Sequence, residues 1–177
     1  MHQQTHEGLY RAVLACLIGG ACGIAGAAGV PLETDKLRLL ACDMPAMSPA
    51  GGKAAVEWFN GSAQALPGDR GQRLAGPVKL GEACMKNVTL SGSFGVVFVQ
   101  GEICNDRLDD FTATLAGAGV RLEKTSDQKM PEMVLSMQGE ERHFMVTRGM
   151  PDLRTGKVMP GSTPYAFTCI AKVGGHQ

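Results

Sequence analysis

The stretch FGVVFV, residues 94–99, is the segment of this chain that most constrains the fold. Its β-branched and aromatic residues occupy both faces of an extended backbone, which is typical of a strand covered on both sides. The preceding residues 84–90, CMKNVTL, alternate loosely and predict a second strand. Turn-forming residues 91–93, SGS, join the two strands. We therefore expect a hairpin near the centre of a sheet, with Phe98 in the hydrophobic core.

Working outward from this hairpin, residue types and spacing predict two helices. Ser48 and Pro49 are the residue types preferred at the N-cap and first position of a helix, which we expect to end at residues 60–61. Either Asn105 or Asp106 is expected to cap a second helix, whose apolar residues repeat on one face. Each helix therefore has a side that can pack against a sheet.

Segments with strand periodicity follow the second helix, and Gly and Pro interrupt them. Further strands are predicted at residues 120–124, 133–137, 143–147 and 165–171. Residues 37–42 fit either a short strand or a helical turn. The segments 62–79 and 151–164 are expected to be long surface loops, because turn-forming residues recur in both.

This order of elements predicts an α+β fold, with a largely antiparallel sheet and about two helices packed on one face. We expect one domain over residues 28–177. Within it, residues 28–80 would form an N-terminal helix and loop region, and residues 81–177 would form the sheet core. A domain of this length can bury enough surface for a single hydrophobic core.

Residues 1–27 have the features of a cleaved secretory signal peptide. Arg11 precedes an uncharged segment that is too short and too rich in Gly for a membrane span, and residues 25–27, AGA, match the cleavage pattern. The Ala- and Gly-rich, Lys-poor composition favours a bacterial source. We therefore expect a periplasmic or secreted protein with no stable membrane span after cleavage. Lipidation at Cys22 and an uncleaved anchor are the alternatives.

Four cysteines lie beyond the predicted signal. Cys84 and Cys104 flank the central hairpin, so we expect them to pair, which leaves Cys42 with Cys169. None belongs to a C-x-x-C pair, and this argues against thiol–disulfide exchange and against a zinc site. The cysteines are therefore interpreted as structural disulfides of an exported domain.

The composition argues against several function classes. The 17 basic and 17 acidic residues give a formal net charge of zero, which disfavours nucleic acid as a partner. No phosphate-binding loop or dinucleotide fingerprint is present, so no cofactor is expected. His143 is the one histidine in the body of the domain and is interpreted as structural or exposed.

We therefore expect a protein without enzymatic activity. The alternative is a hydrolase that uses an unrecognised pair of carboxylates. The densest acidic group is Asp106, Asp109 and Asp110, which we interpret as residues that stabilise the start of a helix.

A binding protein is the favoured function class, because loops on a rigid scaffold commonly carry recognition residues. The partner is expected to be a protein of the cell envelope, as for an inhibitor or an immunity-type protein. The expected contact residues lie in the two predicted loops, and they are Arg70, Arg73, Asp152, Arg154 and Lys157.

The chain is also rich in methionine, with ten residues. Thioether and imidazole groups suit Cu(I), so the alternative function is a periplasmic copper-binding protein. Its candidate ligands are Met130, Met133, His143 and Met145. The competing interpretation is that these methionines fill the core as adaptable apolar side chains.

Overall fold

The computed structural model of the protein describes residues 29–68, 71–93, 95–125, 132–152, 155, 157–159 and 163–172. The compact unit Pro31–Gln177 contains every described helix and strand apart from the first two residues of the first described helix. The predicted signal peptide lies outside the described residues. No helix among the described residues is long and apolar enough to cross a membrane.

Three α-helices and two short 3-10 helices are described, and one of the α-helices was not expected from the sequence. They are α2 (Gly29–Leu40), η1 (Met44–Ala46), α3 (Pro49–Ser62), η2 (Cys104–Asp106) and α4 (Leu108–Gly117). The predicted start of α3 is confirmed, because the Ser48 hydroxyl accepts a hydrogen bond of 3.0 Å from the Gly51 amide. Of the two alternatives expected for residues 37–42, the structure has the helical one, because residues 37–40 form the end of α2.

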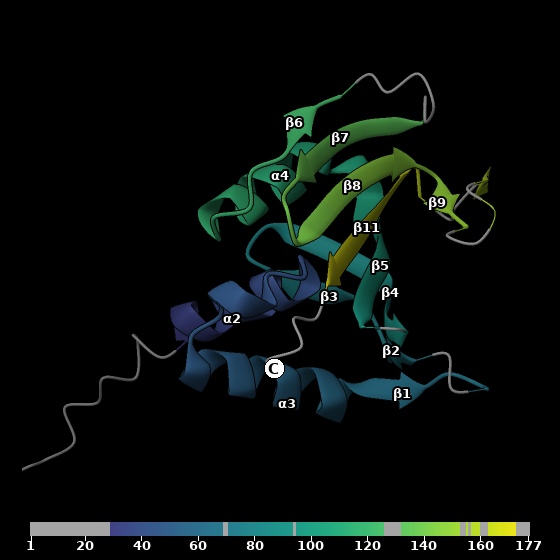
Figure 1. The fold of residues 1–177 in the computed structure, drawn as a ribbon. Helices are drawn as coiled ribbons and strands as arrows, with labels where there is room; N and C mark the ends of the chain where they lie inside the picture. Colours follow the sequence, from purple (N-terminus) through teal and green to yellow (C-terminus); the bar gives the residue numbers. More distant parts are fainter. Residues whose placement is uncertain are drawn as a thin grey trace, which may run out of the picture. The chain divides into compact units, whose positions relative to one another are not determined.

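Eleven strands are described in the part of the chain that the structure covers, and all pair antiparallel. Nine form one sheet in the order β1-β2-β4-β5-β11-β8-β7-β6, with β3 also paired to β4, and β9 and β10 form a separate hairpin (Figure 1). The strands are β1 (Ala63–Ala65), β2 (Gln72–Leu74), β3 (Val78–Leu80), β4 (Ala83–Ser93), β5 (Val96–Ile103), β6 (Glu123–Lys124), β7 (Met133–Gln138), β8 (Arg142–Arg148), β9 (Met150–Pro151), β10 (Val158–Met159) and β11 (Tyr165–Lys172). The predicted α+β class is therefore confirmed.

The hydrophobic core lies between the helices and one face of the sheet. Phe111 of α4 packs on Phe144 of β8 and Phe167 of β11, with ring centroids 5.5–6.4 Å apart. Gly101 of β5 lies directly opposite Phe167, and a Cβ at Gly101 would come within 2.7 Å of the Phe167 ring. The absent side chain lets the aromatic ring lie against the β5 backbone.

The prediction that Phe98 belongs to the core is wrong. Phe98 is half-buried, whereas its neighbour Val99 is fully buried. Successive side chains of a strand point to opposite faces, and the helices cover only the face that carries Val99. Phe98 instead lies in register with Ser91 on β4 and Ile170 on β11, on the second face of the sheet.

The segment 62–79, which we expected to be a long loop, contains three short strands. β1 and β2 form a hairpin, and β2 and β3 both pair with β4. The long strand β4 supplies the hydrogen-bonding edge, so these segments need no strong strand pattern of their own. The predicted second loop, 151–164, likewise holds β10 and the end of β9.

The predicted cap of α4 is also wrong. Arg107 occupies the N-cap position without a side-chain cap, and Asn105 and Asp106 belong to η2 with positive φ angles of 56° and 53°. Asn and Asp tolerate this left-handed conformation better than most residues. Asn105 and Asp106 are therefore suited to the turn that precedes α4 and do not cap the helix.

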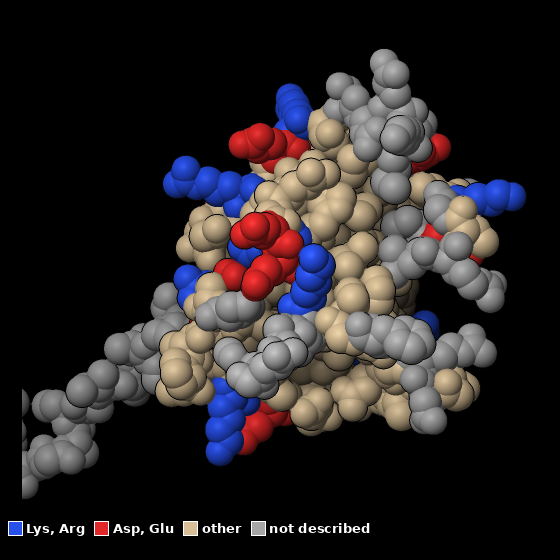
Figure 2. All heavy atoms as spheres, in the orientation of Figure 1, with Lys and Arg blue, Asp and Glu red and all other residues tan. Residues whose placement is uncertain are grey.

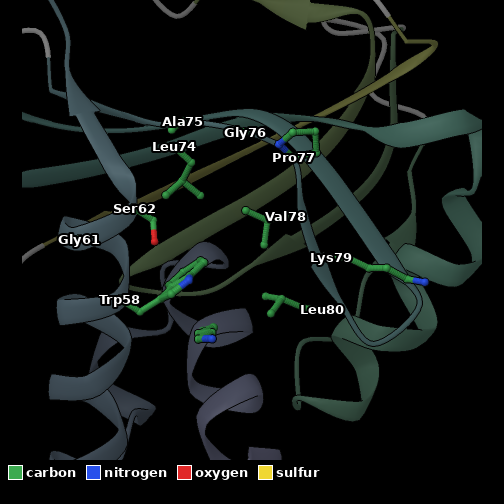
Figure 3. A pocket seen from close by; sticks show the side chains of 11 residues that line it. Trp58, Gly61, Ser62, Leu74, Ala75, Gly76, Pro77, Val78, Lys79 and Leu80 are labelled. Carbon is green, nitrogen blue, oxygen red and sulfur yellow. The ribbon is translucent and has the colours of Figure 1, made fainter.

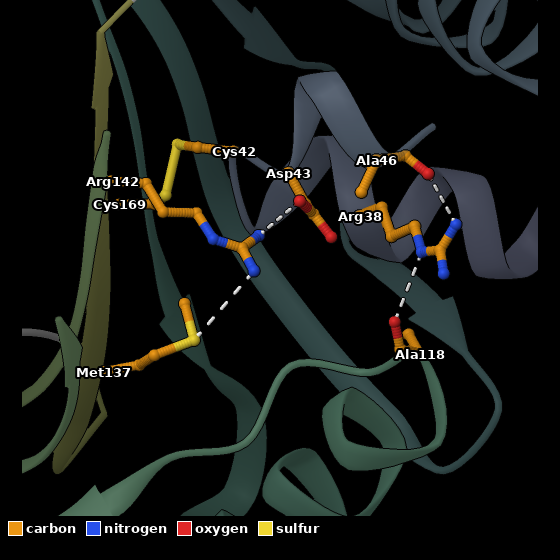
Figure 4. Close-up of polar contacts among 8 residues, drawn as sticks. All are labelled: Arg38, Cys42, Asp43, Ala46, Ala118, Met137, Arg142 and Cys169. Carbon is orange, nitrogen blue, oxygen red and sulfur yellow. Dashed lines mark hydrogen bonds and ion pairs between the residues drawn. A yellow bond between two sulfur atoms is a disulfide. The ribbon is translucent and has the colours of Figure 1, made fainter. Parts of the chain in front are cut away.

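Both predicted disulfides are confirmed. Cys42–Cys169 joins the residues after α2 to β11 across a sequence separation of 127, and Cys84–Cys104 joins β4 to η2 across a separation of 20. Beside the first disulfide, the Arg142 guanidinium lies 2.9 Å from the Asp43 carboxylate (Figure 4). The end of α2 is thus fastened to the sheet by a covalent bond and an ion pair.

Candidate functional site

A groove with a volume of about 460 Å³ lies between two helices and the β2–β3 segment (Figure 3). Its walls are Lys36 of α2, Trp58, Gly61 and Ser62 at the end of α3, and residues 74–80. We call it the Trp58 groove. Its volume falls in the range of typical ligand pockets, and apolar and polar groups both contribute to its lining.

The path of the chain along β4 creates one wall of the groove. β2 reaches β4 at Thr89, and β3 reaches the same edge of β4 at Met85. Between these points the pairing of β4 with β5 is irregular, and Asn87 has a positive φ of 54°. Residues 75–77 therefore leave the strand edge, and all three are exposed.

Trp58 forms the opposite wall and is the single tryptophan of the chain. In Figure 3 its ring faces the gap toward Val78. The Lys36 ammonium lies 4.9 Å from the ring centroid, within the range of a cation–π interaction. Trp58 thus presents an aromatic surface and holds a cation beside it.

The groove is electropositive. Lys36 places its ammonium beside Trp58, the Lys79 side chain points away from Trp58 (Figure 3), and none of the lining residues is acidic. The described part of the chain provides no salt bridge for either lysine. On the face drawn in Figure 2, by contrast, acidic and basic side chains lie interspersed. A lining with lysine and no carboxylate is therefore a local feature of the groove.

The three predicted contact residues that the structure describes lie in two parts of the fold. Arg73 is exposed on β2. Three strands of the sheet, β4, β5 and β11, lie between β2 and β8. Asp152 and Lys157 lie in the connection between β9 and β10, where the Asp152 amide donates to the Lys157 carbonyl at 2.8 Å. Arg70 and Arg154 lie outside the described residues.

Three of the four predicted copper ligands share the second face of the sheet. His143 and Met145 are two residues apart on β8, and Met133 pairs in register with Thr147 of the same strand. Met133 and Met145 are buried. The remaining candidate, Met130, lies outside the described residues.

His143 has an unusual environment on this face. Its Nε2 atom is buried, and it finds no hydrogen-bond partner among the described residues. Burial lowers the pKa of His143 below its ordinary value of 6.5, so the imidazole is neutral near pH 7. Its in-register neighbours are Ile170 and Gln138, neither of which can orient an imidazole as a carboxylate would.

The acidic group at the start of α4 has structural contacts. Asp110 forms an ion pair with Arg107, and the Asp109 carbonyl accepts a hydrogen bond from Thr112 at 3.0 Å. Both aspartates lie in the first turn, as the sequence predicts. Among the described residues no group of three or more His, Cys, Asp or Glu side chains could hold a metal ion.

A second groove, of about 430 Å³, lies at the edge formed by β6 and β7. Charged groups of both signs line it, including Arg121, Glu123 and Lys124. Because these charges can neutralise one another, this groove has a weaker preference for a charged ligand than the Trp58 groove.

No family model matches the chain, and comparisons with curated proteins and with solved structures found no match. Function is therefore inferred from the residues themselves. Sequence reasoning missed the pairing of Lys36 with Trp58, because the two residues meet only when α2 packs beside α3. The feature of the sequence that could have indicated this groove is the single tryptophan, which lies three residues before a Gly-Ser pair at the end of a helix.

Proposed function

We propose that the protein is an exported, disulfide-stabilised binding protein of the bacterial cell envelope, without catalytic activity, that recognises another protein through the Trp58 groove. Inhibitors and immunity proteins act in this manner. The observation that carries the proposal is the groove itself, where Trp58 and the Lys36 ammonium, which has no carboxylate partner in the described structure, border an open space. Aromatic residues in concave surfaces are frequent anchors of protein recognition.

The two disulfides support the exported location. Such bonds form and persist in oxidising compartments, and the pairs Cys42–Cys169 and Cys84–Cys104 together hold the helices and the sheet. Residues 1–27, with the pattern of a secretory signal, support the same location.

The state of the reactive side chains supports a non-catalytic role. All four cysteines beyond the predicted signal are in disulfides, so none of them is available as a thiolate nucleophile. The Nε2 atom of His143 has no hydrogen-bond partner in the part of the chain that the structure describes, and a general base normally works within a hydrogen-bonded pair.

Two glycines at the groove allow the proposal to be tested without disturbing the fold. A Cβ added at Gly61 or Gly76 would meet no atom within 4 Å, and both residues line the groove. The double variant Gly61→Gln/Gly76→Gln should therefore fill the groove while the melting temperature stays unchanged. Gly117→Gln, at the end of α4, is the matched control, because its added Cβ would also meet open space.

The experiment uses wild type and both variants with a photo-reactive residue in place of Pro77, incubated with an envelope fraction of the source bacterium. A cross-linked protein should appear with wild type and with the control, and should disappear with the double variant. Once identified and purified, that protein should bind wild type in isothermal titration calorimetry with the same dependence on the groove. Equal binding by the groove-filling variant would overturn the proposal.

A second function, Cu(I) binding, is favoured by one observation: His143, whose Nε2 has no partner within the described ranges, shares a sheet face with Met145 and Met133. Neutral imidazole and thioether groups are ligands that Cu(I) accepts. Competition with a chromogenic Cu(I) chelator measures this directly. Affinity should fall in Met145→Leu and stay unchanged in Met44→Leu, whose side chain is exposed in η1. Equal affinity in both variants would exclude this site.

A further inference from the structure

We propose that the ligand of the Trp58 groove is a short acidic segment of a protein, in which an Asp or Glu side chain lies next to an apolar one. The carboxylate would be held by Lys36, and the apolar side chain would pack on Trp58. This inference rests on the proposed function, since it names the chemistry that the same groove recognises.

The charges of the groove favour a carboxylate. Lys36 and Lys79 are the only ionisable residues among those lining the groove, and Lys79 points away from Trp58 (Figure 3), so a ligand carboxylate beside Trp58 would meet the Lys36 ammonium and no like charge. Neither lysine has a salt bridge within the described part of the chain, so binding would not have to break one. A partly buried groove also weakens the screening that water provides at an open surface.

The cation–π contact fixes one of these cations. The Lys36 ammonium lies 4.9 Å from the centroid of the Trp58 ring, and the residue is half-buried. A lysine held in this way loses less side-chain freedom on binding than a free surface lysine. Lys36 is therefore expected to supply the charge that recognises the ligand, whereas Lys79 is exposed and points away from Trp58 (Figure 3).

The apolar lining supplies the second half of the recognition. Trp58 and Val78 are half-buried, and Pro77 is exposed on the rim. These groups offer surface to an aliphatic or proline side chain, whose burial stabilises a complex in proportion to the area removed from water. A ligand that combines charge with an apolar group fits this groove better than a simple anion.

A nucleic acid is a poorer fit than an acidic protein segment. Binding to a phosphate backbone depends on many basic groups arranged along a surface. Of the groove's lining residues, Lys36 is the one that holds a cation beside Trp58, the chain as a whole has no net charge, and the face in Figure 2 shows mixed charges.

The inference can be tested with a phage-displayed library of random peptides, selected on wild type after depletion on Gly61→Gln/Gly76→Gln. Selected peptides should be enriched in Asp or Glu beside an apolar residue. Synthetic copies should change the fluorescence of Trp58, which reports on the groove alone because the chain has no other tryptophan. Replacing Glu by Gln in those peptides should weaken binding about tenfold or more, and the loss should shrink at high salt.

Charge variants at one position separate the electrostatic effect from the steric one. Relative to Gly76→Gln, the variant Gly76→Glu should weaken binding of the acidic peptides by roughly threefold to tenfold, and Gly76→Lys should strengthen it. Lys36→Gln should weaken binding and Lys36→Arg should preserve it. Lys53→Gln, which removes an exposed cation of α3 outside the groove, should have no effect.

The outcomes distinguish this inference from the proposed function. The inference would be overturned by selected peptides that require the groove but lack acidic residues. It would also be overturned by peptides whose affinity is the same for the Glu, Gln and Lys variants of Gly76. Either result would leave the proposed function intact. Failure to select any groove-dependent peptide would overturn both. A single-stranded oligonucleotide that competes as strongly as the selected peptides would also overturn the inference, because it would assign the groove to nucleic acid.

Discussion

The Asp43 carboxylate lies 2.9 Å from the Arg142 guanidinium, directly beside the disulfide between Cys42 and Cys169 (Figure 4). Both side chains are largely buried, at 14% and 21% exposed. Arg142 also directs a second nitrogen toward the sulfur of Met137, at 4.0 Å. Cys42, which follows α2, is thus bonded covalently to β11, and the adjacent Asp43 forms an ion pair with Arg142 of β8.

Loss of the Arg142 charge should therefore destabilise the protein. Arg142→Gln would leave the Asp43 carboxylate without its cation in a poorly solvated position, at an expected cost of about 1–3 kcal/mol. Urea unfolding of wild type and the variant measures this. Lys53→Gln disrupts an exposed ion pair with Glu57 and is the control, with little expected change. Equal stability of wild type and Arg142→Gln would show that the Asp43–Arg142 pair is unimportant.

The two disulfides should differ in their contribution to stability. In the chain-entropy description, a longer closed loop restricts the unfolded state more strongly. The separation of 127 residues for Cys42–Cys169 then corresponds to about 5 kcal/mol, and the separation of 20 for Cys84–Cys104 to about 3 kcal/mol. Unfolding of the two double Cys→Ala variants tests this order. The opposite order would indicate that structure in the unfolded chain dominates.

Gly101 should not tolerate a side chain. Gly101→Ala would place a Cβ within 2.7 Å of the Phe167 ring, and we expect overpacking to cost about 1–3 kcal/mol. Gly117→Ala meets no atom within 4 Å at the end of α4, so it should be neutral or slightly stabilising. Thermal melts of both variants give the comparison. Similar melting temperatures would mean that the ring moves aside at little cost.

The two faces of the sheet should respond differently to loss of an aromatic ring. Phe111→Ala opens a cavity in the core between α4 and the sheet and should cost about 3–5 kcal/mol. Phe98 is half-buried on the second face, so Phe98→Ala should cost clearly less. Denaturant titration of both variants measures the difference. A larger cost at Phe98 would show that the second face carries part of the core.

His143 should make stability depend on pH. Burial lowers its pKa in the folded state below 6.5, so between the two pKa values the unfolded chain binds a proton that the folded chain does not. The stabilisation is complete above pH 6.5 and is lost as the pH falls through the lower folded-state pKa. Urea midpoints measured from about pH 7.5 to about pH 5 should therefore fall more steeply in wild type than in His143→Gln. Parallel curves would show that other groups control the pH dependence.

The sequence by itself determined the fold class and the covalent framework. The spacing of apolar residues in 108–118 and the alternation in 133–147 are local properties, and α4 and the β7–β8 hairpin form where these patterns predict them. The start of α3 could be predicted because Ser48 and Pro49 determine the local backbone: the Ser48 side chain caps the first turn, and Pro49 occupies its first position. The disulfide pairing followed from the four cysteines beyond the predicted signal and the position of one hairpin between two of them.

Only the tertiary structure decided which surfaces are buried and where a ligand could bind. β1, β2 and β3 are too short to show a periodicity, and they become strands because β4 offers them an edge. Phe98 is apolar, yet it lies on the sheet face that the helices do not cover. The Trp58 groove unites Lys36, the end of α3 and the β2–β3 segment. Local patterns are set by neighbours along the chain, whereas a groove is set by packing between elements distant in sequence, and for this reason only the folded protein shows it.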